Sequence, residues 1–174
     1  MTAEPPFEIR ELGASVEEAR LLGVLTVEAY VPLLDLADGD PYLHELADVE
    51  RRAGLAVVLV AVDAAGALLG GVTYVPGPGP YAEFEGPRDA GIRMLAVVAA
   101  ARGRGVGSAL VEACIERARS EGRRRLWLHT TARMTDAHRL YGRLGFRRAP
   151  EHDRALPDVH LIGYVLDLDP TAGD

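Results

Sequence analysis

One block of twelve residues constrains the fold of this chain more than any other: Val97-Val-Ala-Ala-Ala-Arg-Gly-Arg-Gly-Val-Gly-Ser108. An apolar, β-prone run leads into the block, and a pattern with helical spacing follows it. Glycines let backbone N–H groups point inward and let an anion approach closely, while a helix N-terminus adds unpaired N–H groups and a positive dipole end. The block's glycines and side-chain donors are Gly103, Gly105, Gly107, Arg102, Arg104 and Ser108. Together these parts predict a site for a pyrophosphate group.

Two common nucleotide-binding motifs do not fit this block. A phosphate-binding loop of the Gly-x-x-x-x-Gly-Lys-Ser/Thr type is missing from the sequence. The dinucleotide fingerprint Gly-x-Gly-x-x-Gly fails because Gly103-x-Gly105 is followed by Ser108 instead of a third glycine. The next strand, Leu126–Thr130, also lacks the terminal acid that would bind a ribose.

Apolar periodicity and turn residues predict the other elements. Strands are expected over Phe7–Arg10, Leu55–Val62, Ala67–Val75, Ile92–Val98, Leu126–Thr130 and Leu161–Leu168. A first helix is expected from an N-cap at Ser15 to a break or kink at Pro32, and a second over Pro41–Ala53, closed by Gly54. A third is expected over Gly105–Glu121, and a fourth from an N-cap at Thr135 to Gly145. This order predicts an α/β sandwich around one mixed sheet.

Length and composition indicate an ordinary globular protein. The 174 residues suit one domain, and a net charge of −7 argues against a general nucleic-acid binder. A single cysteine, Cys114, rules out an internal disulfide and fits a reducing compartment. No apolar run is long enough for a membrane span, and the first ten residues do not resemble a signal peptide, so we expect a cytoplasmic location without membrane attachment.

The glycine-rich block also carries a family resemblance. Arg102-x-x-Gly105-x-Gly107 resembles the Gln/Arg-x-x-Gly-x-Gly/Ala motif of the GNAT superfamily of acetyltransferases. Met94–Val97 looks like that family's fourth strand, and Ala137-His-Arg-Leu-Tyr-Gly-Arg-Leu-Gly-Phe146 is similar to its Ala-x-x-Leu-Tyr-x-x-Leu-Gly-Phe segment. The resemblance implies an α/β (α+β) fold with a mixed, mostly antiparallel sheet of about six to seven strands. About four helices would flank this sheet, which would splay between the fourth and fifth strands, and residues 1–174 would form one N-acetyltransferase domain.

The resemblance further implies that acetyl-CoA is the co-substrate and that no metal takes part. Residues expected to bind it are Leu95, Ala96, Val97, Arg102, Gly103, Arg104, Gly105, Val106, Gly107 and Ser108. A substrate amine would attack the thioester directly, helped by proximity and by a backbone N–H of the fourth strand that stabilises the thioester oxygen. Tyr141 would act as the general acid for the departing thiolate, although its position in an apolar stripe also fits simple packing.

The general base is where the sequence departs from the family pattern. Many members carry a glutamate near the start of the fourth strand, where this chain has Gly91 or Ile92. The nearest acids are Glu83, Glu85 and Asp89 in the preceding loop, and any of them could act through water or be solvated loop charge. Glu83 and Glu85 are the base candidates. Met134 stands where many relatives have an asparagine, which removes an expected amide contact to the pantetheine arm.

The acceptor is expected to be a small-molecule or peptide amine. Tyr30 and Tyr81 are candidates for lining its pocket, and the five histidines show no metal-ligand spacing and are interpreted as structural. Cys114 is interpreted as packed core. Two alternatives stay open beside the N-acetyltransferase: a non-catalytic acyl-CoA sensor or structural domain, and a transferase of a longer acyl group. A homodimer is a candidate assembly, with Leu161–Leu168 as the pairing edge or face.

Overall fold

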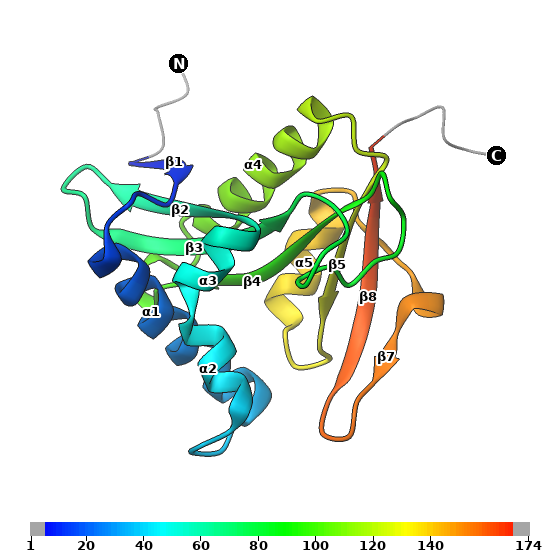
Figure 1. The fold of residues 1–174 in the computed structure, drawn as a ribbon, viewed down its shortest axis with the longest axis horizontal. Helices are drawn as coiled ribbons and strands as arrows, with labels where there is room; N and C mark the ends of the chain where they lie inside the picture. Colours follow the sequence, from blue (N-terminus) through cyan, green and yellow to red (C-terminus); the bar gives the residue numbers. More distant parts are fainter. Residues whose placement is uncertain (1–5, 169–174) are drawn as a thin grey trace. The chain divides into compact units, whose positions relative to one another are not determined.

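The computed structural model describes residues 6–168, which form eight strands, five α-helices and two short 3-10 helices (Figure 1). The strands are β1 Phe7–Glu11, β2 Val57–Asp63, β3 Leu68–Val75, β4 Ala90–Val97, β5 Arg125–Thr130, β6 Arg147–Arg148, β7 Arg154–Ala155 and β8 His160–Asp167. The helices are α1 Val16–Leu34, α2 Pro41–Ala47, α3 Val49–Leu55, η1 Ala99–Ala101, α4 Val106–Ser120, α5 Thr135–Arg143 and η2 Pro150–His152.

Hydrogen bonding orders the strands β1-β2-β3-β4-β5-β8-β6, and β7 also pairs with β8. The pairs β1–β2, β5–β8, β6–β8 and β7–β8 are antiparallel, whereas β4 and β5 are parallel. The parallel pairing joins Ala90–Ile92 to Leu126–Leu128, which uses three of the eight residues of β4. The predicted mixed, mostly antiparallel sheet is therefore confirmed, with eight strands among the described residues where about six to seven were expected.

The described residues group into two compact units, which we treat separately. The first unit contains 6–73 and 94–110, and the second contains 74–93 and 111–168. In the first unit, α1 and α3 lie on the near side of β2 in the view of Figure 1. Ala19 and Leu22 of α1 pack with Val49 of α3 and with alternate valines of β2, Val58, Val60 and Val62. Because alternate strand residues share a face, this cluster fixes which side of β2 the helices cover.

The turn between β2 and β3 forms as its residues predict. The Asp63 carboxylate accepts hydrogen bonds from the N–H groups of Ala65 and Ala67 at 2.9 and 2.8 Å. Gly66 has a φ of +82°, in the left-handed region that favours glycine. The backbone N–H of Asp63 donates to the Ala67 carbonyl at 3.0 Å, which closes the hairpin.

Several predicted helix ends are wrong. Helix α1 continues through Pro32 to Leu34, so the proline does not end it. The single helix expected over 41–53 is two helices, because Asp48 leaves helical geometry and its carboxylate caps the N–H of Arg51 at 3.1 Å. Helix α3 also runs past Gly54 to Leu55, and Thr135 is the first residue of α5, not its N-cap.

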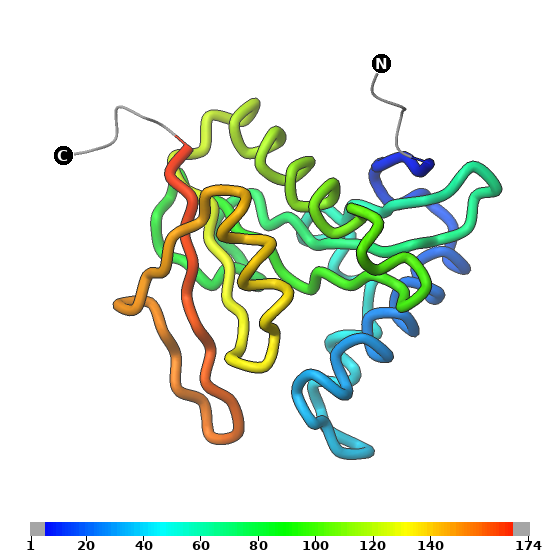
Figure 2. Tube along the Cα trace, turned by 180° about the vertical axis from the view of Figure 1, so that it is seen from behind, coloured from blue at the N-terminus to red at the C-terminus, as the bar shows by residue number. Residues whose placement is uncertain are grey.

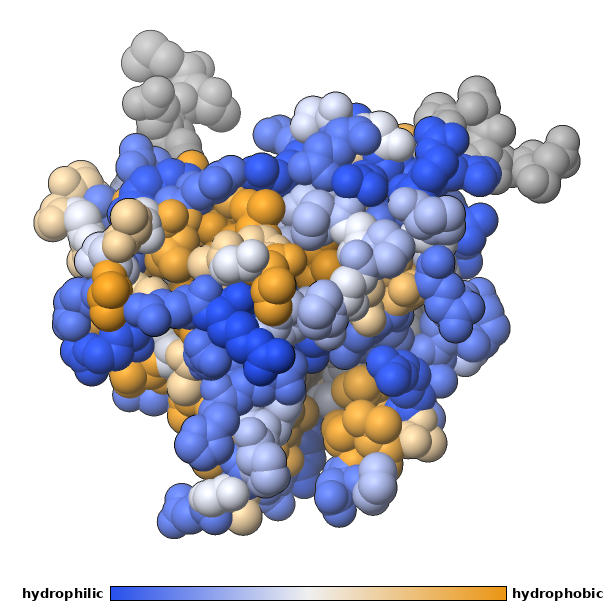
Figure 3. All heavy atoms as spheres, viewed as in Figure 1, coloured by the Kyte–Doolittle hydropathy of each residue, from blue (hydrophilic) through white to orange (hydrophobic). Residues whose placement is uncertain are grey.

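The second unit is built around β5 and β8, which pair over six residues from Arg125 with Asp167 to Thr130 with Ile162. The tube in Figure 2 shows α5 and the β7–β8 hairpin beside these strands. On its other side β8 pairs with β6 and with β7, two-residue strands that the sequence patterns did not predict. Strand β8 is therefore flanked on both sides, so it is not a free edge for a homodimer, whereas pairing through one of its faces stays a prediction. Figure 3 shows a patch of apolar surface towards the lower end of the β7–β8 hairpin. Leu156, in the loop between β7 and β8, is 45% exposed.

Candidate active site

The glycine-rich block forms an exposed loop that leads into α4 in the first unit. Gly103 and Gly105 have φ angles of +73° and +83°, and a Cβ on either one would have no heavy atom within 4 Å. The hydrogen bond from the Ala109 N–H to the Gly105 carbonyl, at 3.0 Å, opens the helix. The N–H groups of Val106, Gly107 and Ser108 precede that bond and so lack intrahelical partners. The side chains of Arg102 and Arg104 are exposed beside them.

The strand before this loop is held from both sides within the first unit. Ala96 of β4 is buried in a cluster with Leu25 and Ala29 of α1, and Tyr30 packs against the same cluster. On β3, a Cβ at Gly70 would lie 2.5 Å from the Ala96 carbonyl oxygen, so only glycine allows this close approach. The backbone of β4 at 95–97, where pantetheine was predicted to pair, is thus packed against α1 at Ala96 and against Gly70 of β3.

Met94 is an unusual residue at the start of this segment. It is buried, and its φ of +55° is rare for a residue with a side chain. A left-handed residue inside a strand interrupts the regular alternation and turns the chain, as in a β-bulge. This left-handed residue lies directly before Leu95–Val97, and no pattern in the sequence predicts it.

Tyr141 lies on α5 in the second unit and is 5% exposed. Its ring contacts Phe146 at 5.7 Å and Tyr164 at 6.2 Å between centroids. Burial, together with the neighbouring Cys114, raises the pKa of the Tyr141 phenol, so the phenol keeps its proton at neutral pH. Burial likewise raises the pKa of Cys114 to about 12, which leaves it a thiol and agrees with a packing role.

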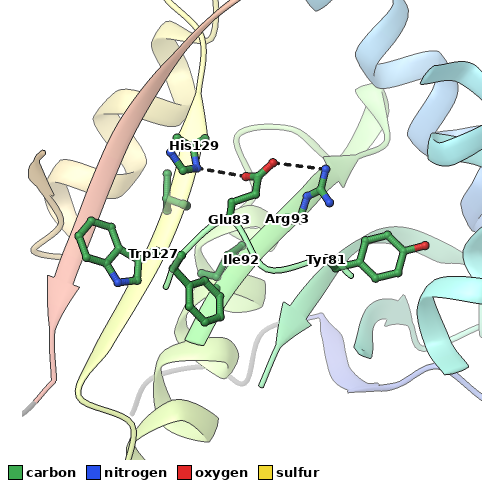
Figure 4. Close-up of a pocket in the computed structure, with 9 residues that line it drawn as sticks. Tyr81, Glu83, Ile92, Arg93, Trp127 and His129 are labelled. Carbon is green, nitrogen blue, oxygen red and sulfur yellow. Dashed lines mark hydrogen bonds and ion pairs between the residues drawn. The ribbon is translucent and has the colours of Figure 1, made fainter. Parts of the chain in front are cut away.

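Glu83 lies at the centre of a charged cluster in the second unit (Figure 4). One carboxylate oxygen lies 3.1 Å from Nδ1 of His129 on β5, and the other lies 3.4 Å from Nη2 of Arg93 on β4. Nε2 of His129 lies 3.0 Å from the carbonyl oxygen of His152. The exposed fractions of the side chains are 20% for Glu83, 3% for His129 and 14% for Arg93. Water therefore screens the interactions between their charges weakly.

Opposing effects act on the Glu83 carboxyl group. Burial alone would raise its pKa, but the hydrogen bond to His129 and the charges of Arg93, His129 and Arg154 outweigh burial and lower the pKa. Glu83 is therefore a carboxylate at neutral pH. Glu85, the other predicted base candidate, is exposed on the same loop.

Aromatic residues line a small pocket around this cluster. Tyr81, Phe84 and Trp127 border it together with Glu83 and His129. Trp127 Nε1 donates to the buried carboxylate of Asp89 at 2.8 Å and so ties the loop at 81–89 to β5. The Arg93 guanidinium lies over the Tyr81 ring, 5.6 Å from its centroid. The loop is thus held by polar contacts at both ends.

Sequence reasoning missed His129 and Arg93 as members of this cluster. His129 was interpreted as structural, and 46 residues separate it from Glu83. The available signal was indirect: His129 interrupts an otherwise apolar strand, and the distant loop at 81–89 carries Glu83, Glu85 and Asp89.

Among the described residues, no helix is both long and apolar enough to span a membrane.

Comparison with known proteins identifies the fold and the family. A solved GCN5-related N-acetyltransferase from Kribbella flavida is 28% identical, with 95% of this chain and 100% of that chain covered and a TM-score of 0.66. A GNAT-family acetyltransferase from Staphylococcus aureus Mu50 is 15% identical (94% and 99% covered, TM-score 0.72). The protein yncA of Salmonella typhimurium, solved with its cofactor acetyl-CoA, is 22% identical (96% of each chain covered, TM-score 0.65). The sequence matches none of the curated proteins at a significant level. The model of the Acetyltransferase (GNAT) family matches residues 25–146, more than half of the chain, and the chain belongs to this family.

Proposed function

We propose that this protein is an N-acetyltransferase that moves the acetyl group of acetyl-CoA to a primary amine by direct attack in a ternary complex. The observation that carries the proposal is the loop at 102–108, where left-handed glycines and a helix N-terminus present unpaired N–H groups beside two arginines. Family membership supports an acyltransferase, and acetyl-CoA is the cofactor of one structural neighbour.

The first unit would hold the co-substrate. The open space above Gly103 and Gly105 suits the close approach of a pyrophosphate, and Arg102, Arg104 and Ser108 would add charged and hydroxyl donors. The backbone at Leu95–Val97 would pair with the pantetheine arm and offer an N–H to the thioester oxygen. When bound, acetyl-CoA supplies an activated acyl group with a thiolate leaving group.

Two side chains of the second unit would move the protons. The acceptor ammonium gives a proton through water to the Glu83 carboxylate, because only the neutral amine attacks. The nitrogen lone pair then forms the C–N bond and the C–S bond breaks. The attacking nitrogen loses its second proton to water, and the departing sulfur takes the phenol proton of Tyr141. We choose Glu83 over Glu85 because Glu83 is held in a half-buried, oriented position while Glu85 is exposed. Solvent afterwards returns a proton to the phenol and removes one from the carboxyl group.

The acceptor would be a small-molecule or peptide amine, with Tyr30 and Tyr81 as candidate lining residues. We also propose that residues 1–174 act as one N-acetyltransferase domain in the cytoplasm. A homodimer stays a prediction, with a face of β8 and not its edge as the candidate contact.

The proposal is tested by thiol release from acetyl-CoA and from succinyl-CoA across a panel of primary amines. We expect acetyl-CoA turnover with at least one amine, and the Gly105→Val variant should lose it. Binding of acetyl-CoA without turnover on any amine would favour the acyl-CoA sensor. Faster turnover with succinyl-CoA would favour a transferase of longer acyl groups.

A further inference from the structure

His129 occupies a position that fixes where its protons lie. Its Nε2 faces the backbone carbonyl of His152 at 3.0 Å, and a carbonyl oxygen can only accept a hydrogen bond, so Nε2 carries a hydrogen. Its Nδ1 faces a Glu83 oxygen at 3.1 Å, which also needs a hydrogen between the two atoms. One proton therefore lies in the contact between Glu83 and His129, in addition to the one on Nε2.

The surroundings of the pair decide which partner holds this proton. The charges of two arginines act on the Glu83 carboxylate: Arg93 of β4, whose Nη2 lies 3.4 Å from it, and Arg154 of β7. They favour the carboxylate over the neutral acid, so Nδ1 of His129 acts as the donor. The imidazole is itself held in place, because its other nitrogen is bound to His152 and its side chain is 3% exposed.

We propose that His129 is a positioning residue for acetyl transfer, which keeps the Glu83 carboxylate ionised and aimed while Glu83 accepts the proton of the acceptor amine. The inference rests on the proposed function, because it assigns His129 a role through the proposed base. It predicts that the two residues act as one unit, since His129 has no part in the reaction except through Glu83. A histidine that only supports the strand would instead affect stability without changing the titration of Glu83.

Two substitutions separate the two hydrogen bonds of His129. In His129→Asn, the amide nitrogen takes the place of Nδ1 and still donates to Glu83. In His129→Gln, the amide nitrogen takes the place of Nε2 and still donates to the His152 carbonyl, while the bond to Glu83 is lost. His138→Gln is a matched control. His138 lies on α5, and its Nε2 binds the Thr131 carbonyl at 2.8 Å. Among the described residues, its hydrogen bond goes to this carbonyl and not to a carboxylate.

The deciding measurement is an NMR titration of the Glu83 carboxyl carbon, assigned by its disappearance in Glu83→Gln. We expect the midpoint of Glu83 to rise by about 1–3 pH units in His129→Gln, to stay low in His129→Asn, and to remain unchanged in His138→Gln. An unchanged midpoint in His129→Gln would overturn the inference. This readout needs no acceptor, so it remains informative even if no amine is turned over and the proposed function fails.

Kinetics with an active amine supply the second readout. The acid limb of kcat/KM should move to higher pH in His129→Gln, following the Glu83 midpoint. In a Glu83→Gln background, adding His129→Gln should change kcat by less than about twofold, because the residue through which it acts is gone. Multiplicative losses in the double variant would overturn the inference alone, whereas a wild-type rate in Glu83→Gln would overturn both the inference and the base assignment.

Discussion

Gly70 of β3 offers a direct test of how the candidate cofactor strand is held. A methyl group there would lie 2.5 Å from the Ala96 carbonyl oxygen and 3.2 Å from the Cα of Val97. Ordinary contact begins near 3.4 Å, so the methyl group would be about 0.9 Å too close to the carbonyl. Both obstacles are backbone atoms, which cannot rotate away as a side chain would. Gly70→Ala must therefore displace β4 at the residues proposed to bind pantetheine.

The expected cost follows from that displacement. Overpacking of this kind costs about 1–3 kcal/mol of unfolding free energy. For a domain of this size each kcal/mol lowers Tm by about 2–4 °C, so we expect Tm to fall by about 2–12 °C. A shift of nearly 1 Å at reacting groups costs on the order of 10²-fold in rate, so kcat/KM should fall on that scale. Circular dichroism melts and thiol-release kinetics measure the two effects.

Gly54→Ala is the matched control for Gly70→Ala. Gly54 is the next-to-last residue of α3, and a Cβ there would meet no heavy atom within 4 Å. Alanine in a helix interior is more stable than glycine by about 0.5–1 kcal/mol, so the same substitution should raise Tm and leave kcat/KM unchanged. A Gly70→Ala protein with the Tm and kcat/KM of the wild type would refute the close packing of β3 on β4.

Three further predictions concern the candidate site. Gly105→Val places a side chain at a φ of +83° in the cofactor loop, so the folded variant should lose acetyl-CoA binding by calorimetry, and retained affinity would remove this loop from the site. Tyr141→Phe should lower kcat by roughly 10- to 10⁴-fold with little change in Tm, and a wild-type kcat with chemistry rate-limiting would make Tyr141 a packing residue. The pKa of Glu83 is lowered in the folded state, so its ionised form stabilises the fold at every pH above the ordinary carboxyl pKa of 4.5. This stabilisation is lost as the pH falls through the lowered pKa. Urea titrations should show the stability difference between wild type and Glu83→Gln shrinking as the pH falls below that ordinary value; a pH-independent difference would contradict the ion pairing.

Elements with a strong local pattern were predicted well from the sequence. The hairpin around Asp63–Ala67, helix α4 and strand β5 each follow from periodicity and turn chemistry within one short window. Strands β6 and β7 are two residues long, which is too short for any period to appear, and they form because β8 offers them a partner. The sequence predicts one helix where Asp48 separates α2 from α3. The helical pattern continues through this position, but the Asp48 carboxylate caps a new helix instead.

The candidate site likewise has one part that the sequence predicts and two features that it does not. The loop at 102–108 is contiguous, and its residue types alone indicate an anion site. The cluster of Glu83, Arg93 and His129 depends on a loop folding back onto two strands, so no local pattern could reveal it. The left-handed Met94 was equally hidden, because a methionine gives no sign of an unusual φ.

Transfer of an acetyl group from acetyl-CoA to an amine is the reaction that we propose for this chain. The most direct measurement incubates the protein with acetyl-CoA and an amine panel, then quantifies free CoA and the acetylated amine by mass spectrometry in the same sample. We expect equal molar amounts of CoA and N-acetylated product, with both abolished in Gly105→Val and both strongly reduced in Tyr141→Phe. Tight binding of acetyl-CoA with no acetylated amine from any member of the panel would contradict it.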